Sequence, residues 1–217
     1  MRTFIPGILA GWASAAVFAF TFVPEEPACA IQLDKMNVFY MGFDNPVSIV
    51  VRGVPEQEVR IETSDNLTIQ KYGNYHYNVR PSMVGEATIT VSGGKLKPVT
   101  FKYRVKRIPD PAVRLGAMYR SGAIPNGAFR AQAGLAAVIE NFDIDAKCEM
   151  VSYKVIHLRK GQLIAEVTNN GARYNPAVQA VIDAAMPGDT YIFDEIKVRC
   201  PGDAVPRAME GLTVVIK

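Results

Sequence analysis

The sequence has few of the residues that most often carry catalysis. Its 217 residues include only two histidines, His76 and His157, which lie far apart in the chain. It contains no HExxH motif, no paired CxxC motifs, no GxSxG motif and no P-loop, the patterns that carry zinc, serine-nucleophile and nucleotide chemistry. We therefore expect a protein that is not an enzyme and that binds no metal and no cofactor.

Strong charge of one sign is also missing. The 24 basic and 21 acidic residues give a net charge of +3, and the two signs alternate along the chain. Nucleic-acid-binding domains usually carry a basic run or stripe, so we expect no nucleic-acid partner.

The carboxylates do not form an acidic site that the sequence can define. Asp143 and Asp145 can share one face of a strand, but the other oxygen ligands of a calcium loop do not follow them. Asp194 and Glu195 are neighbours, and neighbours on a strand point to opposite faces. A hydrolase would need carboxylates of both groups to meet in one cleft, and a turn is the more common role of Asp143 and Asp145.

Cysteine is scarce, and two of the three cysteines lie beyond the first 30 residues. An exported protein can form disulfides, so Cys148 and Cys200 are a candidate pair. Their neighbours favour another interpretation, because Cys200 alternates in step with Ile196, and Cys148 with Met150, as small buried hydrophobes in strands do. We expect two buried thiols in preference to a disulfide.

The long uncharged run of residues 4–23 is interpreted as an export segment. Ala28-Cys29-Ala30 supplies a small-x-small cleavage site, which favours a signal peptide cleaved after Ala30. The run is also long enough for a single transmembrane helix, in which Gly7 and Gly11 would form a GxxxG contact. We expect membrane contact only through residues 4–23, and only if the segment is retained.

A proline-containing spacer, Arg107-Ile108-Pro109-Asp110-Pro111, divides the rest of the chain. Each proline fixes its own φ, lacks an amide donor and pushes the preceding residue into an extended conformation. Before the spacer, the sequence shows the period of two residues that is typical of strands, and after it a helical period also appears. The predicted fold is mainly β, with two tandem β-sandwich-like domains, the first at residues 34–107 and the second, which includes one packed α-helix, at residues 110–217.

The first of these domains contains short runs rich in Val, Ile, Thr, Tyr and Phe, as in an Ig-like β-sandwich. Alternating apolar and polar residues indicate half-buried antiparallel strands. Gly73-Asn74 and Gly93-Gly94 are predicted two-residue hairpin loops. His76 is predicted to face solvent. The strand candidates are residues 37–41, 47–51, 58–63, 67–71, 75–79, 86–92 and 99–106.

The last of these strands has one basic face. Lys102, Arg104 and Lys106 share it, and apolar or aromatic residues alternate with them. Such a strip can receive an acidic partner, but it is more often a solvated face that discourages edge-to-edge aggregation.

The second domain shows helical periodicity over residues 175–186, with Asn175 as N-cap and Pro176 in the first turn. Strands are predicted at residues 148–159, 162–168, 190–200 and 212–216, and another is expected to begin at Ala112. The apolar run of residues 135–139 can form a strand or a short helix. We expect His157 to be a partly buried histidine with a hydrogen-bond partner.

Three segments resemble the GldM/PorM family of gliding motility and type IX secretion in Bacteroidetes. Residues 36–47, MNVFYMGFDNPV, are similar to the opening of that family's third domain. Ile108-Pro109-Asp110-Pro111 is similar to the junction before its last domain, and Asn141-Phe142-Asp143-Ile144-Asp145 resembles a signature of that last domain. The resemblance extends over residues 34–217.

The resemblance implies a periplasmic, non-catalytic protein, either released or anchored in the inner membrane. Family members are dimers whose periplasmic rods couple a motor to an outer-membrane ring, so a homodimer is one expectation. Here residues 24–35 take the place of the family's additional periplasmic domains, so we expect docking on envelope or secretion-machine proteins rather than full motor coupling. The alternative is a free extracytoplasmic module that binds a peptide or glycan. The candidate docking residues are Asp143, Asp145, Arg199, Asp203, Arg207, Lys102, Arg104 and Lys106.

Overall fold

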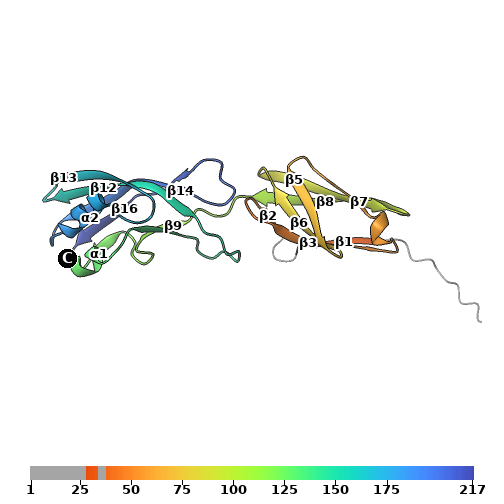
Figure 1. Ribbon diagram of the computed structural model, residues 1–217, viewed down its shortest axis with the longest axis horizontal. Coiled ribbons are helices and arrows are strands. Elements are labelled where there is room, and N and C mark those ends of the chain that lie inside the picture. Colours follow the sequence, from red (N-terminus) through yellow and green to blue (C-terminus); the bar gives the residue numbers. More distant parts are fainter. Residues whose placement is uncertain (1–27, 34–37) are drawn as a thin grey trace, which may run out of the picture.

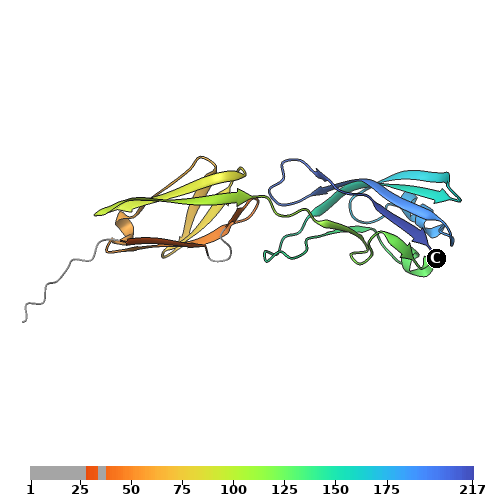
Figure 2. The same cartoon turned by 180° about the vertical axis from the view of Figure 1, so that it is seen from behind.

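The computed structural model describes residues 28–33 and 38–217. Two domains lie end to end, and a single linker segment joins them (Figures 1 and 2). The C-terminus lies at the end of the second domain that is farthest from the first. Among the described residues, no helix is both long and apolar enough to span a bilayer. The predicted export segment, residues 4–23, lies outside the described part.

The first domain is a sandwich of two four-stranded sheets. One sheet has the order β1-β3-β6-β5 and the other β2-β8-β7-β4. A continuous apolar core that includes Phe39, Val79 and Ile89 fills the space between them. The strands are β1 Ala28–Leu33, β2 Phe39–Tyr40, β3 Asn45–Arg52, β4 Arg60–Thr63, β5 Leu67–Gly73, β6 His76–Pro81, β7 Gly85–Gly93 and β8 Leu96–Lys106, with a 3₁₀ turn at Glu56–Glu58.

Alternation explains these strands. In β7, Ala87, Ile89 and Val91 are buried and the intervening threonines face outward, so the chain buries one face of each strand. The hairpin loops lie one residue later than predicted, because Gly73 pairs with His76 and Gly93 with Leu96.

Strand β1 is a structural element that the sequence interpretation missed. It pairs with β3 along its whole length, from Ala28 opposite Arg52 to Leu33 opposite Val47. The first domain therefore includes residues before the predicted start at residue 34. The predicted cleavage site after Ala30 lies within β1, and cleavage there stays a prediction.

The second domain is built on a six-stranded sheet with the path β10-β16-β14-β12-β13 and β15 beside β14. A separate pair, β9 and β11, and two short helices complete the domain, and α2 packs on the sheet (Figure 1). The prediction of a mainly β fold, with one packed α-helix in the second domain, is confirmed. The elements are β9 Ala112–Leu115, β10 Gly122–Ile124, α1 Asn126–Arg130, β11 Leu135–Val138, β12 Glu149–Arg159, β13 Gln162–Asn170, α2 Pro176–Asp183, β14 Thr190–Arg199, β15 Arg207–Ala208 and β16 Leu212–Ile216.

Helix α2 begins as the sequence predicts. The Asn175 side chain accepts a hydrogen bond from the Val178 amide, and Pro176 occupies the first turn. Val178 and Ile182 are fully buried against the sheet, as the i, i+4 spacing requires. The ambiguous run at residues 135–139 forms strand β11.

Candidate functional site

The clearest built site in the molecule is the joint between the two domains. It comprises the turn at residues 40–45 of the first domain, the linker at residues 107–111, and two loops of the second domain at residues 141–148 and 200–207. Side chains of the first domain enter it, since Tyr40 and Phe43 pack against the hydrophobic core of the second domain. The ring of Tyr40 meets that of Phe142 edge-on, with centroids 4.9 Å apart.

Asn45 shapes the first-domain side of the joint. Its side-chain amide donates hydrogen bonds to the carbonyls of Tyr40, Phe43 and Val79, and its oxygen accepts one from the Tyr40 amide. Asn45 is only 8% exposed, and a buried amide with its donors and acceptor satisfied holds a turn in one conformation. The turn is therefore presented to the second domain as a fixed shape.

Two glycines allow the backbones of the domains to touch. Gly42 has φ +83° and Gly202 has φ +82°, a conformation that glycine adopts readily. A Cβ on Gly42 would clash with the backbone of Pro201 and Gly202, and a Cβ on Gly202 would lie 2.8 Å from the Met41 carbonyl carbon. Any side chain at either position would separate the domains.

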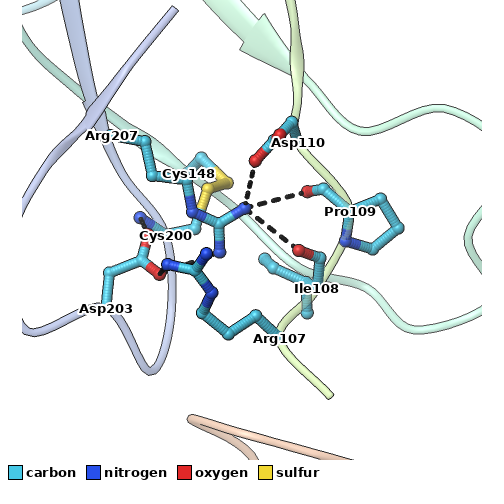
Figure 3. The surroundings of a disulfide bond; sticks show 8 residues. All are labelled: Arg107, Ile108, Pro109, Asp110, Cys148, Cys200, Asp203 and Arg207. Atoms are coloured by element: carbon cyan, nitrogen blue, oxygen red, sulfur yellow. Dashed lines mark hydrogen bonds and ion pairs between the residues drawn. A yellow bond between two sulfur atoms is a disulfide. The ribbon is translucent and has the colours of Figure 1, made fainter. Parts of the chain in front are cut away.

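Arg207 fixes the linker to the second domain (Figure 3). One of its guanidinium nitrogens donates to the carbonyls of Ile108 and Pro109 and to the Asp110 carboxylate, at 3.0, 3.4 and 2.8 Å. The other donates to Asp203 at 2.8 Å. Ile108 itself is buried in the core of the second domain. The linker is thus held by apolar burial and by a five-donor side chain that spans two of its carbonyls.

Asp203 completes this network. Its carboxylate also accepts a hydrogen bond from the Cys200 amide, and Arg107 approaches it at 4.0 Å. Burial raises the pKa of this carboxyl, but the bonds from Arg207 and the Cys200 amide outweigh it, so the pKa lies below its ordinary value.

Asp203 and Arg207 therefore do not fit their predicted role as docking residues. Their side chains are 0% and 8% exposed and their charges are used within the molecule. Sequence reasoning placed them in a polar terminal loop, and no local signal shows that the loop folds onto the linker.

Cys148 and Cys200 form a disulfide. The interpretation as two separate buried thiols does not hold, although the predicted strand parity is correct. The reason is that β12 and β14 are adjacent strands. Glu149 lies opposite Arg199, so Cys148 and Cys200 are the next opposing residues. Cys29, in β1, is a free thiol whose pKa is raised by partial burial.

The other docking candidates are exposed, but they do not form one site. Asp143 and Asp145 lie in the joint loop, and Arg199 ends β14 beside the disulfide. Asp145 also lines a cavity of about 240 Å³ at the joint. That cavity is lined by Leu33, Val38, Phe43, Asp44, Asn45, Pro46, Ile144 and Asp145.

The basic residues Lys102, Arg104 and Lys106 lie along the solvent face of β8 in the first domain. Glu86 and Thr88 of β7 are the cross-strand neighbours of Arg104 and Lys102. Among the residues that the structure describes, β8 is an edge over most of its length, because β2 pairs only with Val105 and Lys106. The strip is therefore accessible both through its side chains and along part of its backbone edge.

A second polar cluster is buried in the C-terminal domain. Nε2 of His157 lies 2.9 Å from Oδ2 of Asp189, and Arg159 donates two further bonds to the same carboxylate, at 2.9 and 2.8 Å. Asp189 also accepts a bond from the Met186 amide. The Arg159 contact is the main cause of a pKa of Asp189 well below its ordinary value. His157 has a hydrogen-bond partner, as predicted, but it is fully rather than partly buried.

This cluster is structural in its geometry. It joins β12 to the end of α2, since Arg159 also donates to the Ala184 carbonyl, and the His157 ring stacks on Tyr191 at 4.4 Å. Its histidine and arginine both contact its carboxylate directly. In residues 28–33 and 38–217, no group of three or more His, Cys, Asp or Glu side chains is placed to hold a metal ion.

The segments on which the family resemblance rests meet at the joint. Residues 40–45 form its first-domain turn, Ile108-Pro109-Asp110-Pro111 is its linker, and residues 141–145 lie in its second-domain loop. The family models agree with that resemblance: the GldM third domain matches residues 28–106, and the GldM C-terminal domain matches residues 108–217. This chain belongs to the GldM family.

Several solved structures match this GldM-family chain at low sequence identity. The fibronectin(III)-like modules of Clostridium thermocellum CbhA are 16% identical with a TM-score of 0.26, and they cover 87% of this chain and 94% of their own. Domains 6–7 of the surface layer protein SbsC are 11% identical with a TM-score of 0.34, covering 87% and 97%. No curated protein matches the sequence.

Membership of the GldM family defines the class of protein. GldM domains belong to structural components of the gliding and type IX secretion apparatus, are periplasmic in the family, and act through protein–protein interaction. Domains of this type are typically structural and not enzymatic.

Proposed function

We propose that this chain is a periplasmic, non-catalytic docking protein that binds a component of the gliding or type IX secretion apparatus through its two β domains. The ordered match to the GldM third and C-terminal domains carries the proposal. The joint supports it, because a linker held by Arg207 and a close contact between Gly42 and Gly202 present both domains as one elongated surface.

The direct test is site-specific photocrosslinking of the full chain in its native cells. A photoreactive residue replaces Lys102 on β8, Asp143 in the joint loop or Arg199 at the end of β14, one at a time. The expected result is a covalent adduct with a gliding or secretion component from at least one of these positions. Lys95, in the β7–β8 turn, serves as the control position. The proposal fails if all three positions yield no adduct, or only the adducts that Lys95 yields.

We further propose that the basic face of β8 contacts an acidic surface of this partner. Lys102, Arg104 and Lys106 present three like charges along one strand face, which favours a partner of opposite charge. The double change Lys102→Glu with Arg104→Glu should reduce the captured partner roughly tenfold, with a matching loss when salt is added to the wild type. Lys95→Glu with Lys97→Glu makes the same charge change at the hairpin and should have little effect. Equal loss in both variants would show that only net charge matters.

A second candidate function, binding of an envelope glycan, is favoured by the β5–β6 hairpin. Tyr72 and Tyr75 are 55% and 40% exposed there, and the Tyr72 ring stacks on His76 at 5.9 Å. An exposed aromatic ring with a polar end suits a surface that is partly apolar and partly wet, such as a sugar. Sedimentation with purified peptidoglycan tests it: binding by the wild type that Tyr72→Ala abolishes supports the glycan function, and no binding by the wild type excludes this glycan.

A further inference from the structure

The disulfide lies at the end of the C-terminal sheet that faces the first domain. Glu149 and Arg199 are the last paired residues of β12 and β14 at that end, and Cys148 and Cys200 close the ladder immediately beyond them. Figure 3 shows the bridge beside the linker, next to Arg207 and Asp203. The covalent bond is therefore part of the joint and not of the centre of the domain.

Each loop of the second domain that touches the first domain has one end at this bridge. The chain that leads into Cys148 carries Phe142, which meets Tyr40, and Ile144, which lines the joint cavity. The chain that leaves Cys200 carries Gly202, which touches the backbone of the first-domain turn, and Asp203, which holds Arg207. Neither loop has regular secondary structure between its cysteine and these contacts. The bridge thus ties together the two contact points of the second domain.

The ion pairs at the linker each have one exposed partner. Asp110, which pairs with the buried side chain of Arg207, is 73% exposed, and Arg107, at 57% exposed, reaches the buried side chain of Asp203 only at 4.0 Å. Solvent screens such pairs, so they contribute less than fully buried ones. Domains joined by one linker move relative to each other by default, unless their interface is large and hydrophobic, so a covalent tie at this position bears on their motion.

We propose that the Cys148–Cys200 disulfide sets the rigidity of the joint, so that the two domains keep one relative orientation only while the bridge is formed. Without it, the loops at residues 141–148 and 200–207 separate, the contacts of Gly202 and Phe142 with the first domain open, and the linker becomes a hinge. The cores of both domains stay folded. The proposal concerns the motion of this chain alone, so it does not depend on the proposed docking function.

The test measures the distance between the domains in the full chain. A ketone-bearing unnatural amino acid replaces Gln70 on β5 and Lys197 on β14, two exposed positions. A spin label is then attached to each ketone, which leaves every cysteine unchanged. Double electron–electron resonance should give one narrow distribution of distances between the two labels in the oxidised chain. In the variant Cys148→Ala with Cys200→Ala, the width of the distribution should increase roughly twofold or more, as expected when an interdomain contact is released.

Two controls show that the labels report on the joint. Cys29→Ala removes the free thiol of β1 and should leave the distribution narrow. Gly202→Ala keeps the bridge but introduces a Cβ that meets Met41, so it should broaden the distribution. If Gly202→Ala broadens the distribution and the loss of both bridge cysteines does not, the proposal is overturned.

Reduction of the unmutated chain reaches the same state by a second route. Dithiothreitol donates two electrons and two protons, the bridge becomes two thiols in their original places, and the reagent becomes a cyclic disulfide. Amide hydrogen exchange then follows each part of the chain. Faster exchange at residues 38–46 and 200–207, with β13 and α2 still protected, supports the proposal. Complete loss of protection in β13 and α2 would also overturn it, because the C-terminal domain would then be unfolded without the bridge.

Discussion

The two domains are stabilised in different ways. In the first domain, the one buried polar residue of the described part is Asn45, and the core is otherwise apolar from Phe39 to Val105. The C-terminal domain buries His157, Asn169 and Asp189 and has a disulfide. The first domain depends on alternating apolar residues, whereas the second depends on specific links between distant residues.

The comparison shows how a small β domain can be tied to a neighbour. Asn45, the buried polar residue of the first domain, lies at the joint, and so does the disulfide of the second. The His157–Asp189–Arg159 cluster instead joins the sheet to the end of α2, and α2 lies in the half of the C-terminal domain away from the first domain (Figure 1). Specific polar and covalent links are therefore found at the joint between the domains and at the contact between the sheet and α2.

The largest expected effect is the loss of the disulfide. Cys148→Ala with Cys200→Ala opens a loop of 52 residues, and chain entropy alone makes such a bridge worth about 4 kcal/mol. Calorimetry of the full chain should show two transitions, of which only that of the C-terminal domain moves down. The matched control, Cys29→Ala, should leave the C-terminal transition in place. An equal shift of both transitions would show that the domains unfold as one unit and would remove the contrast between them.

The buried ion cluster gives the next largest effect. Asp189→Asn removes the charge that Arg159 and His157 both face, and breaking a buried pair in this way costs about 3 kcal/mol. Chemical unfolding of the full chain should show this loss in the C-terminal domain. The first-domain counterpart is Asp44→Asn, which breaks an ion pair with Arg80. The side chains of Arg80 and Asp44 are 65% and 49% exposed, so the free energy of unfolding should change little. A small effect of Asp189→Asn would mean that the cluster is not a main support of the domain.

Acid should lower the stability of the C-terminal domain more than that of the first domain. The pKa of Asp189 in the folded chain lies well below its ordinary value of 3.8. Its stabilising contribution is therefore complete above about pH 4 and is lost as the pH falls through the folded value. Unfolding temperatures measured from neutral pH downward should fall less steeply for Asp189→Asn than for the wild type. Parallel pH profiles would contradict the assigned role of Asp189.

The smallest expected effect compares the two cores directly. Ile89 in the first domain and Ile182 in the second are both 0% exposed, so Ile→Val removes one buried methyl group from each. Each change should cost about 1 kcal/mol and should lower only the transition of its own domain. A shift in the wrong transition would show that the assignment of the two transitions is incorrect.

Most strands could be predicted because their evidence is local. Alternation identified β4 and β7, runs rich in Val, Ile, Thr, Tyr and Phe identified β3, β5 and β6, and helix α2 followed from its cap and spacing. The one-residue error in the hairpins arose because glycine was assigned to the loop, whereas Gly73 and Gly93 pair across it. Short elements such as β10 and α1 escaped because three to five residues carry too little periodicity.

The elements of the joint could be predicted only in part. The family resemblance rested on residues 36–47, 108–111 and 141–145, which include the joint turn at residues 40–45, without indicating that these segments meet. Arg207 and Asp203 were recognised as polar residues, but their burial depends on a linker almost a hundred residues earlier in the chain. The cysteine pair required the knowledge that β12 and β14 are neighbours.

The sequence by itself determined the β-rich architecture, the division at the proline-containing spacer, the capped helix and the family. The first three features follow from periods of two and 3.6 residues and from the conformations that proline and asparagine impose, whereas the family follows from the resemblance of three segments. The tertiary structure alone decided which strands are adjacent, and hence that Cys148 meets Cys200, that Arg207 holds the linker and that Gly42 touches Gly202. The physical reason is that side-chain periodicity defines the buried face of each strand, while the choice of neighbour depends on packing between residues far apart in the chain.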